Sequence, residues 1–346
     1  MRAGLLSPGV RENPLFEIGI KRYIEAMMQR RHFSHALLGW SVASAWPSAQ
    51  AQASTLKLLV GFAPGGSVDL TARALADAMK DSLGRSVIVD NKPGAAGRLV
   101  LEAVKQARAD GNTLMLVPHG PMTLFPWIHR QLRYDPVKDF TPIGRVCVVD
   151  YALTTGPATP AKSIEAYVQW AHDPGNKASY GSPGAGTIPH FIGQGFAQRT
   201  RTDIVHVPYK GSALTMVDLM AGNVSLGVSP LADAIEHHRN GKVRILATTG
   251  SQRSTALKDV PTLKEVGIDL VVDGWYGVYA PAGLPEAQHQ ALTKALEVAV
   301  GKQEEFLQKN AMRPAFMRPE QLAQLQRTES AQWEPWVKAS GFKPED

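Results

Sequence analysis

The chain has 346 residues, of which 44% are hydrophobic and 20% charged, so it is long enough for two domains and too apolar for intrinsic disorder. The formal net charge is +6, but residues 54–346 carry 31 Lys and Arg against 28 Asp and Glu, without a basic run, which argues against a nucleic-acid-binding protein. No stretch of 18 apolar residues is present, which excludes a membrane-spanning helix, and the single cysteine, Cys147, excludes an internal disulfide framework.

Residues 1–53 are predicted to contain an export signal. The pair Arg30-Arg31 is followed by an apolar stretch and by small residues (AQAQA) that are typical of a cleavage site. This pattern fits a Sec signal and a twin-arginine signal equally well. Met27 and Met28 stand just before the arginines, so we expect translation to begin there and the residues before them to be a mis-assigned extension. The mature chain is therefore expected in the periplasm.

In the first half of the mature chain, short apolar runs alternate with amphipathic segments. A strand is predicted over residues 56–62, followed by a helix over 68–83 that Gly84 ends. The remaining elements expected here are a strand over 86–90, a loop at 93–97, a helix to residue 107 and a strand over 112–117. This order is typical of a parallel sheet.

The second half repeats the alternation. A strand over residues 147–153 leads into residues 154–157, a predicted crossing to a second lobe. The further elements expected are helices over 163–171, from 189 and over 213–222, strands over 178–180, 204–207, 224–228, 243–248 and 271–279, and a mostly helical segment over 284–341. The fold class is thus α/β.

The first segment with a chemical signature is GFAPGGSVD, residues 61–69, where the first strand becomes the first helix. Its glycines allow close backbone approach, and the helix start offers unpaired N–H groups, so the segment predicts an anion site. The alternative is a plain turn with Ser67 as the helix N-cap. Because Asp69 would repel an anion, we expect its carboxylate to point at backbone N–H groups and hold the loop.

A second such segment is YGSPGAGTIPH, residues 180–190, which also opens a helix. It lacks the lysine of a phosphate-binding loop and does not match a G-x-S-x-G nucleophile elbow, so nucleotide hydrolysis and serine-hydrolase chemistry are not indicated. Two Gly-rich turns, one in each lobe, favour a binding cleft between the lobes.

Further candidates are spread along the chain. The segment HVPYKG, residues 206–211, offers the cleft a phenol at Tyr209 and a cation at Lys210; the alternative is a solvated strand end. His119 follows a strand and is a candidate for the cleft, with a packed histidine as the alternative.

Three aromatic residues are candidates for a cleft wall: Phe62, Trp275 and Tyr276. For Trp275 and Tyr276 the alternative is core packing within a strand. The ten histidines show no paired metal spacing, and no nucleophile–base pair is visible. We therefore predict neither an enzyme nor a catalytic, metal or cofactor site.

Several motifs occur in a fixed order over residues 55–345: FAPGGSVDLTAR, VIVDNKPGAAG, YDPVKDFTPIG, YGSPGAGTIPH, HVPYKG, LATTGSQR, DVPTLKEVG and WYGVYAPAGLP. In these motifs the chain resembles the Bug-type (TctC-like) substrate-binding proteins of tripartite tricarboxylate transporters. The resemblance implies a two-lobed periplasmic binding protein fold, with a mixed sheet flanked by helices in each lobe and a ligand cleft between them. We expect lobe one at residues 54–154 and 251–346 and lobe two at residues 155–250.

The resemblance also implies a small carboxylate ligand held between the two Gly-rich loops. Thr187 stands where serine is frequent in the family, and residues 225–229 (SLGVS) depart from the family pattern, which leaves the identity of the ligand open. The predicted ligand-binding residues are Phe62, Ala63, Pro64, Gly65, Gly66, Ser67, Asp69, His119, Ser182, Gly184, Gly186, Thr187, His190, Tyr209 and Ser229.

The implied partners are this ligand and the permease subunits of a tripartite transporter, and we expect a monomer that binds no nucleic acid. The alternative is an orphan periplasmic sensor that presents its bound carboxylate to a signalling receptor.

Overall fold

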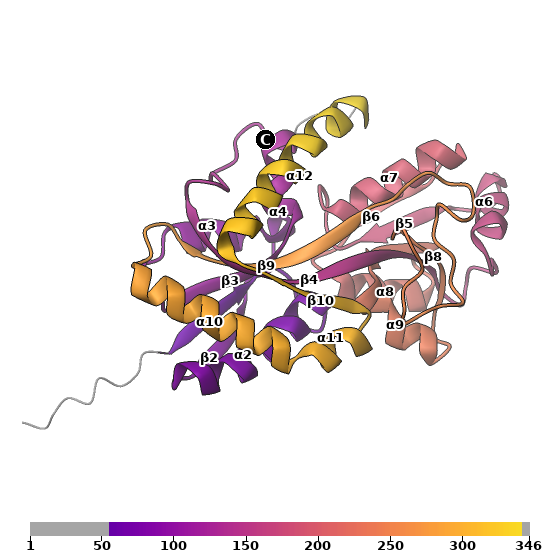
Figure 1. Cartoon of the computed structure of the whole chain (residues 1–346). Coiled ribbons are helices and arrows are strands. Elements are labelled where there is room, and N and C mark those ends of the chain that lie inside the picture. Colours follow the sequence, from indigo (N-terminus) through magenta and orange to yellow (C-terminus); the bar gives the residue numbers. More distant parts are fainter. Residues whose placement is uncertain (1–54, 341–346) are drawn as a thin grey trace, which may run out of the picture. The chain divides into compact units, whose positions relative to one another are not determined.

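The computed structural model describes residues 55–340 (Figure 1). The predicted export signal and extension lie outside the described residues. The described residues all belong to one structural unit. Among them, no helix is both long and apolar enough to cross a membrane.

The first half of the unit is built from parallel strands and crossover helices. Strand β1 (Leu56–Val60) is buried except at Lys57, and pairs in parallel with β2 (Val87–Asn91) and β3 (Thr113–Pro118). Helix α2 (Ser67–Leu83) joins β1 to β2 and ends at Gly84, whose φ of 60° is left-handed. The predicted strand–helix–strand order and the predicted helix stop are confirmed.

One long strand, β4 (Phe140–Thr155), belongs to both halves of the sheet. Toward its start it pairs antiparallel with β9 (Asp273–Pro281), which in turn pairs with β3. Toward its end it pairs antiparallel with β7 (Leu226–Pro230) and with β8 (Arg244–Thr248). The strand order is β2-β1-β3-β9-β4-β7-β5-β6, with β8 and β10 also paired to β4.

The expected mixed sheets of the two lobes are therefore continuous through β4. The other strands, all in the second half of the sequence, are β5 (Ser179–Ser182), β6 (Val205–Pro208) and β10 (Met312–Met317). The names lobe one and lobe two are kept below for the predicted residue ranges, 54–154 with 251–346 and 155–250.

Helices lie on both faces of the sheet (Figure 1). Leu116 of β3 shares a hydrophobic cluster with Leu296 of α10, whereas its neighbour Met115 shares another with Leu322 of α12. Successive residues of a strand point to opposite faces, so α10 and α12 cover opposite sides. The helices are α3 (Arg98–Lys105), α4 (Gly120–Thr123), α5 (Phe125–Ile128), α6 (Ile164–His172), α7 (Ile188–Thr200), α8 (Ser212–Ala221), α9 (Leu231–Arg239), α10 (Glu286–Lys302), α11 (Glu304–Lys309) and α12 (Pro319–Ser340), besides α2 and the short 3-10 helix η1 (Ala95–Gly97).

Five elements differ from the sequence-based prediction. Strand β4 begins seven residues before Cys147, at Phe140, and strand β10 interrupts the segment expected to be helical. Helix α9 and the short helices α4 and α5 were not predicted.

Candidate ligand-binding site

The first Gly-rich loop connects β1 to α2. Gly65 has a φ of 92°, which residues with a Cβ rarely adopt. Helix α2 begins at Ser67, and its N-cap is Gly66, without a side-chain capping bond. Ser67 is therefore not the N-cap, as it would be in the alternative of a plain turn; its Oγ instead lies 2.7 Å from the hydroxyl of Tyr276.

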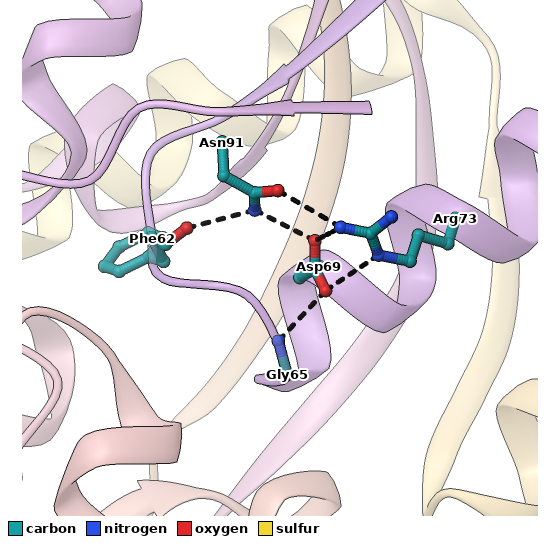
Figure 2. Close-up of polar contacts among 5 residues, drawn as sticks. All are labelled: Phe62, Gly65, Asp69, Arg73 and Asn91. Atoms are coloured by element: carbon teal, nitrogen blue, oxygen red, sulfur yellow. Dashed lines mark hydrogen bonds and ion pairs between the residues drawn. The ribbon is translucent and has the colours of Figure 1, made fainter. Parts of the chain in front are cut away.

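Asp69 holds this loop in place (Figure 2). Its Oδ2 accepts hydrogen bonds from the backbone N–H of Gly65 and from Arg73 Nε, both at 3.0 Å. Asn91 Nδ2 donates to Asp69 Oδ1 at 2.9 Å and to the carbonyl of Phe62 at 3.1 Å. Burial alone would raise the pKa of Asp69, but the hydrogen bonds from Arg73, Gly65 and Asn91 lower that pKa below its usual value. The expectation that Asp69 points at a backbone N–H group is confirmed.

The second Gly-rich loop, between β5 and α7, is also held by its own side chains. Thr187 Oγ1 donates to the carbonyl of Gly184 at 2.7 Å, and Ser182 Oγ donates to the same carbonyl at 3.0 Å. The backbone N–H of Gly186, whose φ is 74°, donates to His190 Nδ1 at 3.0 Å. The side chains of Ser182 and His190 therefore form hydrogen bonds with the backbone of the loop itself.

A stacked histidine pair supports this loop. The rings of His190 and His206 lie parallel with their centroids 3.9 Å apart, and His206 Nε2 lies 2.7 Å from Ser182 Oγ. Burial lowers the pKa of His190 to about 4. Burial, together with His190, lowers the pKa of His206 to about 3, so both rings are neutral at neutral pH.

The two loops meet at a small cavity, here called the inner cavity, of about 40 Å³. Its other walls include Tyr151, Ser212 and Tyr276, of which only Tyr276 was a candidate in the sequence. Trp275 lies in the hydrophobic core instead. The predicted ligand-binding residues that line the inner cavity are Phe62, Ala63, Gly66, Ser67, Asp69 and Thr187.

A second cavity of about 270 Å³, here called the outer cavity, adjoins the inner one, and both are lined by Phe62, Ala96 and Pro183. The predicted residues Gly184 and Tyr209 line it, together with Arg98, His129 and Lys210. Tyr209 is held there by its hydroxyl, which donates to Asp218 Oδ2 at 2.7 Å.

The remaining candidates lie beside or behind the cavities. Pro64 and Gly65 are exposed on the first loop, and Ser229 is buried in β7, where its Oγ donates to the carbonyl of Pro230. His119 is buried, with Nε2 3.0 Å from the Tyr151 hydroxyl and Nδ1 3.2 Å from Glu329 Oε2. It therefore reaches the inner cavity only through Tyr151.

Hydrogen bonds connect the lobes around the inner cavity. The backbone N–H of Ser67, in the first turn of α2, donates to Asp233 Oδ1 of α9 at 2.5 Å. The N–H of Ala63 donates to the carbonyl of Lys210 at 3.2 Å. Burial raises the pKa of the Asp233 carboxyl, while hydrogen bonds from Ser212 and Ser67 oppose that rise. A carboxylate of the protein itself thus occupies one N–H group of the predicted anion site.

Residues 71–342 match the tripartite tricarboxylate transporter family receptor (TctC). The chain belongs to this family. A UPF0065 protein from the gbd 5' region of Cupriavidus necator is 35% identical over 86% of this chain and 93% of its own length. The protein BugT of Bordetella pertussis is 30% identical over 89% of this chain and 97% of its own length. The resemblance seen in the sequence motifs is confirmed.

Solved structures of similar proteins share the fold. The periplasmic binding protein BugD is 28% identical, with a TM-score of 0.81 over 84% of this chain and 99% of BugD. An R. palustris protein with adipate is 28% identical, with a TM-score of 0.81 over 87% of this chain and all of that one. MatC of Rhodopseudomonas palustris, with bound malate, is 27% identical, with a TM-score of 0.76 over 82% of this chain and 99% of MatC.

These findings confirm the predicted periplasmic binding protein fold. The family is one of solute-binding receptors and not of enzymes, as the sequence predicts. Within residues 55–340, no group of three His, Cys, Asp or Glu side chains is arranged to hold a metal ion.

Proposed function

We propose that this protein captures a small carboxylate between its two Gly-rich loops in the periplasm and delivers it to the membrane subunits of a tripartite tricarboxylate-type transporter. One observation carries the proposal: both loops, each opening a helix, line the same inner cavity. Two structural neighbours hold dicarboxylates, adipate and malate, which supports the ligand class.

The chemistry of the inner cavity suits a carboxylate. Helices α2 and α7 begin at its wall, and a helix start carries a partial positive charge. The hydroxyl groups of Ser67, Ser212 and Tyr276 also line it. Because Ser67 and Ser212 bond the Asp233 carboxyl and Ser67 lies 2.7 Å from the Tyr276 hydroxyl, a ligand carboxylate would have to replace these partners. Each hydrogen bond to a carboxylate contributes about 1.5–3 kcal/mol, so a few of them account for micromolar affinity, about −8 kcal/mol.

Ligand entry requires the lobes to move apart. A cavity of about 40 Å³ has room for only a few water molecules. The hydrogen bonds of Ser67 with Asp233 and of Ala63 with Lys210 hold it closed. In this proposal, lobe one and lobe two separate, a carboxylate enters, and its contacts with both loops favour the closed state.

A thermal-shift screen of the full-length protein tests the proposal. The panel contains dicarboxylates, tricarboxylates, aromatic carboxylates and acidic amino acids. A ligand at about 100 times its Kd adds about 2.7 kcal/mol of stability, which raises the midpoint by several degrees. If no acid raises the midpoint of the folded protein, it is not a carboxylate receptor.

The delivery step has its own test. A transport role requires two membrane subunits, so their genes are expected beside this one, and purified permease is expected to bind the ligand-loaded protein. A signalling receptor encoded in their place would favour the sensor alternative. We further propose that the signal within residues 27–53 directs export by the Sec or twin-arginine route and that the protein acts as a monomer.

A further inference from the structure

A third cavity lies between α12 and the segment that leads into β9. It has a volume of about 500 Å³ and is here called the α12 cavity. Such a volume is within the range of small-molecule sites, which is about 300–1,000 Å³. The α12 cavity shares no lining residue with the inner or the outer cavity, so the proposed carboxylate site does not use it.

Two tryptophans of α12 form part of its wall. Trp333 and Trp336 both line the cavity, and a spacing of three residues places them on the same face of the helix. Their rings are nearly perpendicular, at 83°, with the centroids 5.4 Å apart. Both side chains are partly exposed. The face of a tryptophan ring attracts a cation that lies within about 6 Å of its centroid, so one cation can be close to both rings.

A carboxylate stands one turn before Trp333 on the same face of α12. Glu329 Oε2 accepts a hydrogen bond from Trp275 Nε1 at 2.8 Å and lies 3.2 Å from His119 Nδ1. Both partners are buried, whereas the Glu329 side chain is 21% exposed and lines the cavity. Its other oxygen, Oε1, has no hydrogen-bond partner among residues 55–340. A negative charge is therefore held in a fixed position at the cavity wall.

The remaining charges of the α12 cavity leave it negative. Asp269 and Asp273 line it from the segment before β9, and Arg199 lines it from α7. Asp273 is paired with Arg313 at 3.4 Å, and Arg199 Nε donates to the backbone carbonyl of Asp269 at 2.7 Å. With histidine counted as neutral, the carboxylates of Glu329 and Asp269 remain against one guanidinium group. The cavity thus favours a cation, whereas the inner cavity is proposed to bind an anion.

We propose that the α12 cavity binds a small organic cation with an alkylated ammonium head. The rings of Trp333 and Trp336 contact the alkyl groups, and the Glu329 carboxylate balances the charge. A bare ammonium group is strongly hydrated, whereas alkyl groups on the nitrogen present apolar surface that suits tryptophan rings. This inference goes beyond the proposed function, because it concerns a separate site with the opposite charge preference.

Calorimetric titration of the full-length protein at constant ionic strength tests this inference. Choline is compared with dimethylbutanol, the neutral alcohol in which a carbon atom replaces the choline nitrogen. Choline is expected to bind at a single site and at least about tenfold more tightly than this alcohol. Tetramethylammonium is likewise expected to bind more tightly than methylammonium, because only the former has a fully alkylated head.

Substitutions then identify the groups responsible. Glu329→Gln and Trp333→Leu are each expected to weaken choline binding by about fivefold or more, and Trp333→Phe, which keeps an aromatic face, by less than Trp333→Leu. The matched control is Glu334→Gln, which removes the same charge from α12 outside the cavity, where Glu334 pairs with Lys338 at 2.9 Å. It is expected to leave choline binding unchanged. If Trp333→Leu does not fold, Asp269→Asn at an exposed side chain takes its place, with weaker choline binding expected.

The inference is overturned if none of the three cations shows saturable binding, or if choline and its neutral analogue bind equally well. Glu329→Gln and Trp333→Leu variants that both bind choline like wild-type protein would also overturn it. None of these probes carries a carboxylate, so such results leave the proposed function standing. A carboxylate screen without a hit, in turn, leaves the cation site standing.

Discussion

Gly65 occupies the point where the first loop turns into α2. The sequence suggests that a side chain here would obstruct the approach of a ligand to the backbone. The structure indicates a different reason for glycine, because a Cβ at Gly65 would meet only the Cβ of Ala213, at an ordinary 3.8 Å. What requires glycine is the φ of 92°, together with the hydrogen bond from its N–H to Asp69.

Gly65→Val is therefore expected to abolish ligand binding by displacing the loop. The strain is of the order of 1–3 kcal/mol, and the loop can relieve it by moving away from the inner cavity. The control is Gly84→Val at the other end of α2, where φ is also positive (60°) and no atom lies within 4 Å of the added Cβ. Calorimetry is expected to give unchanged affinity for Gly84→Val only; equal affinity for both variants would contradict the prediction.

The buried histidines make stability depend on pH. His190 and His129 have pKa values lowered to about 4, and His206 to about 3, from an ordinary value of 6.5. Below about pH 6.5 the unfolded chain takes up protons that the folded chain does not, so acid favours unfolding.

The free energy of unfolding is thus expected to fall between about pH 6.5 and about pH 4, by up to about 1.4 kcal/mol per pH unit for each histidine. Urea titrations at about pH 7 and about pH 5 measure this, in a range above the titration of most carboxylates. His206→Gln is expected to reduce the slope by one proton. Stability that is constant or rises on acidification would count against the neutral histidine pair.

Only part of the site was predictable from the sequence. The Gly-rich loops were, because a glycine cluster stands between a strand and a helix in each predicted lobe, and this pairing favours a cleft over two plain turns. Tyr151, Arg98 and His129 were missed, since they lie in a strand, at a helix start and after a short helix, with no local motif around them. Only the tertiary fold brings them to the cavities.

At the scale of elements, α7 depends on one glycine. A Cβ on Gly193 would collide with the ring of Tyr180, which lies in β5 directly beneath the helix. The same Tyr180 hydroxyl donates to the carbonyl of His190 at 3.0 Å, so strand, helix and second loop are held together there. The close approach of α7 to β5 thus requires a residue without a side chain.

Gly193→Ala is expected to destabilise the protein by about 1–3 kcal/mol through overpacking, although alanine is the better helix former. The matched substitution is Gly301→Ala in α10, where no atom lies within 4 Å of the added Cβ and a gain of up to about 1 kcal/mol is expected. Urea unfolding measures both. Equal changes in the free energy of unfolding for the two variants would show that the ring of Tyr180 does not exclude a side chain at position 193 of α7.

The elements that were not predicted from the sequence lack the local signals on which such a prediction depends. Strand β4 begins at Phe140, but Pro142 and Gly144 near its start are typical of turns; the structure accommodates them at a register shift opposite β9. Strand β10 contains Pro314 and pairs only at an irregular edge of β4. Helix α9 follows β7 at Pro230 with no intervening loop. By contrast, the regular alternation of short apolar runs with amphipathic segments made the β1–α2–β2 order predictable.

At the scale of the whole molecule, β4 joins the two lobes. It pairs with β9 in lobe one and with β7 and β8 in lobe two, and a register shift occurs between Leu153 and Thr154. This irregularity lies at the predicted crossing. A continuous strand limits how far the lobes can separate, so opening is expected as a bend near this point.

X-ray scattering is expected to detect that bend. If the ligand-free protein in solution samples open states, adding a saturating carboxylate found in the thermal screen lowers the radius of gyration. The Gly65→Val variant, which is expected not to bind, serves as the control and keeps its radius. An unchanged radius in wild-type protein with bound ligand would exclude closure as the response to binding.

The carboxyl of Asp233 has a thermochemical consequence. It is buried beside Ser67, at the point where a ligand carboxylate is proposed to bind, and its pKa is already raised. A second negative charge there raises that pKa further, so we expect the complex to take up a proton.

The binding enthalpies measured in phosphate buffer and in Tris buffer are then expected to differ, and Asp233→Asn is expected to remove the difference. Identical enthalpies in wild-type protein would rule out proton uptake. Affinity for the acid would then rise with proton concentration, so the receptor would retain its ligand best in mildly acidic surroundings.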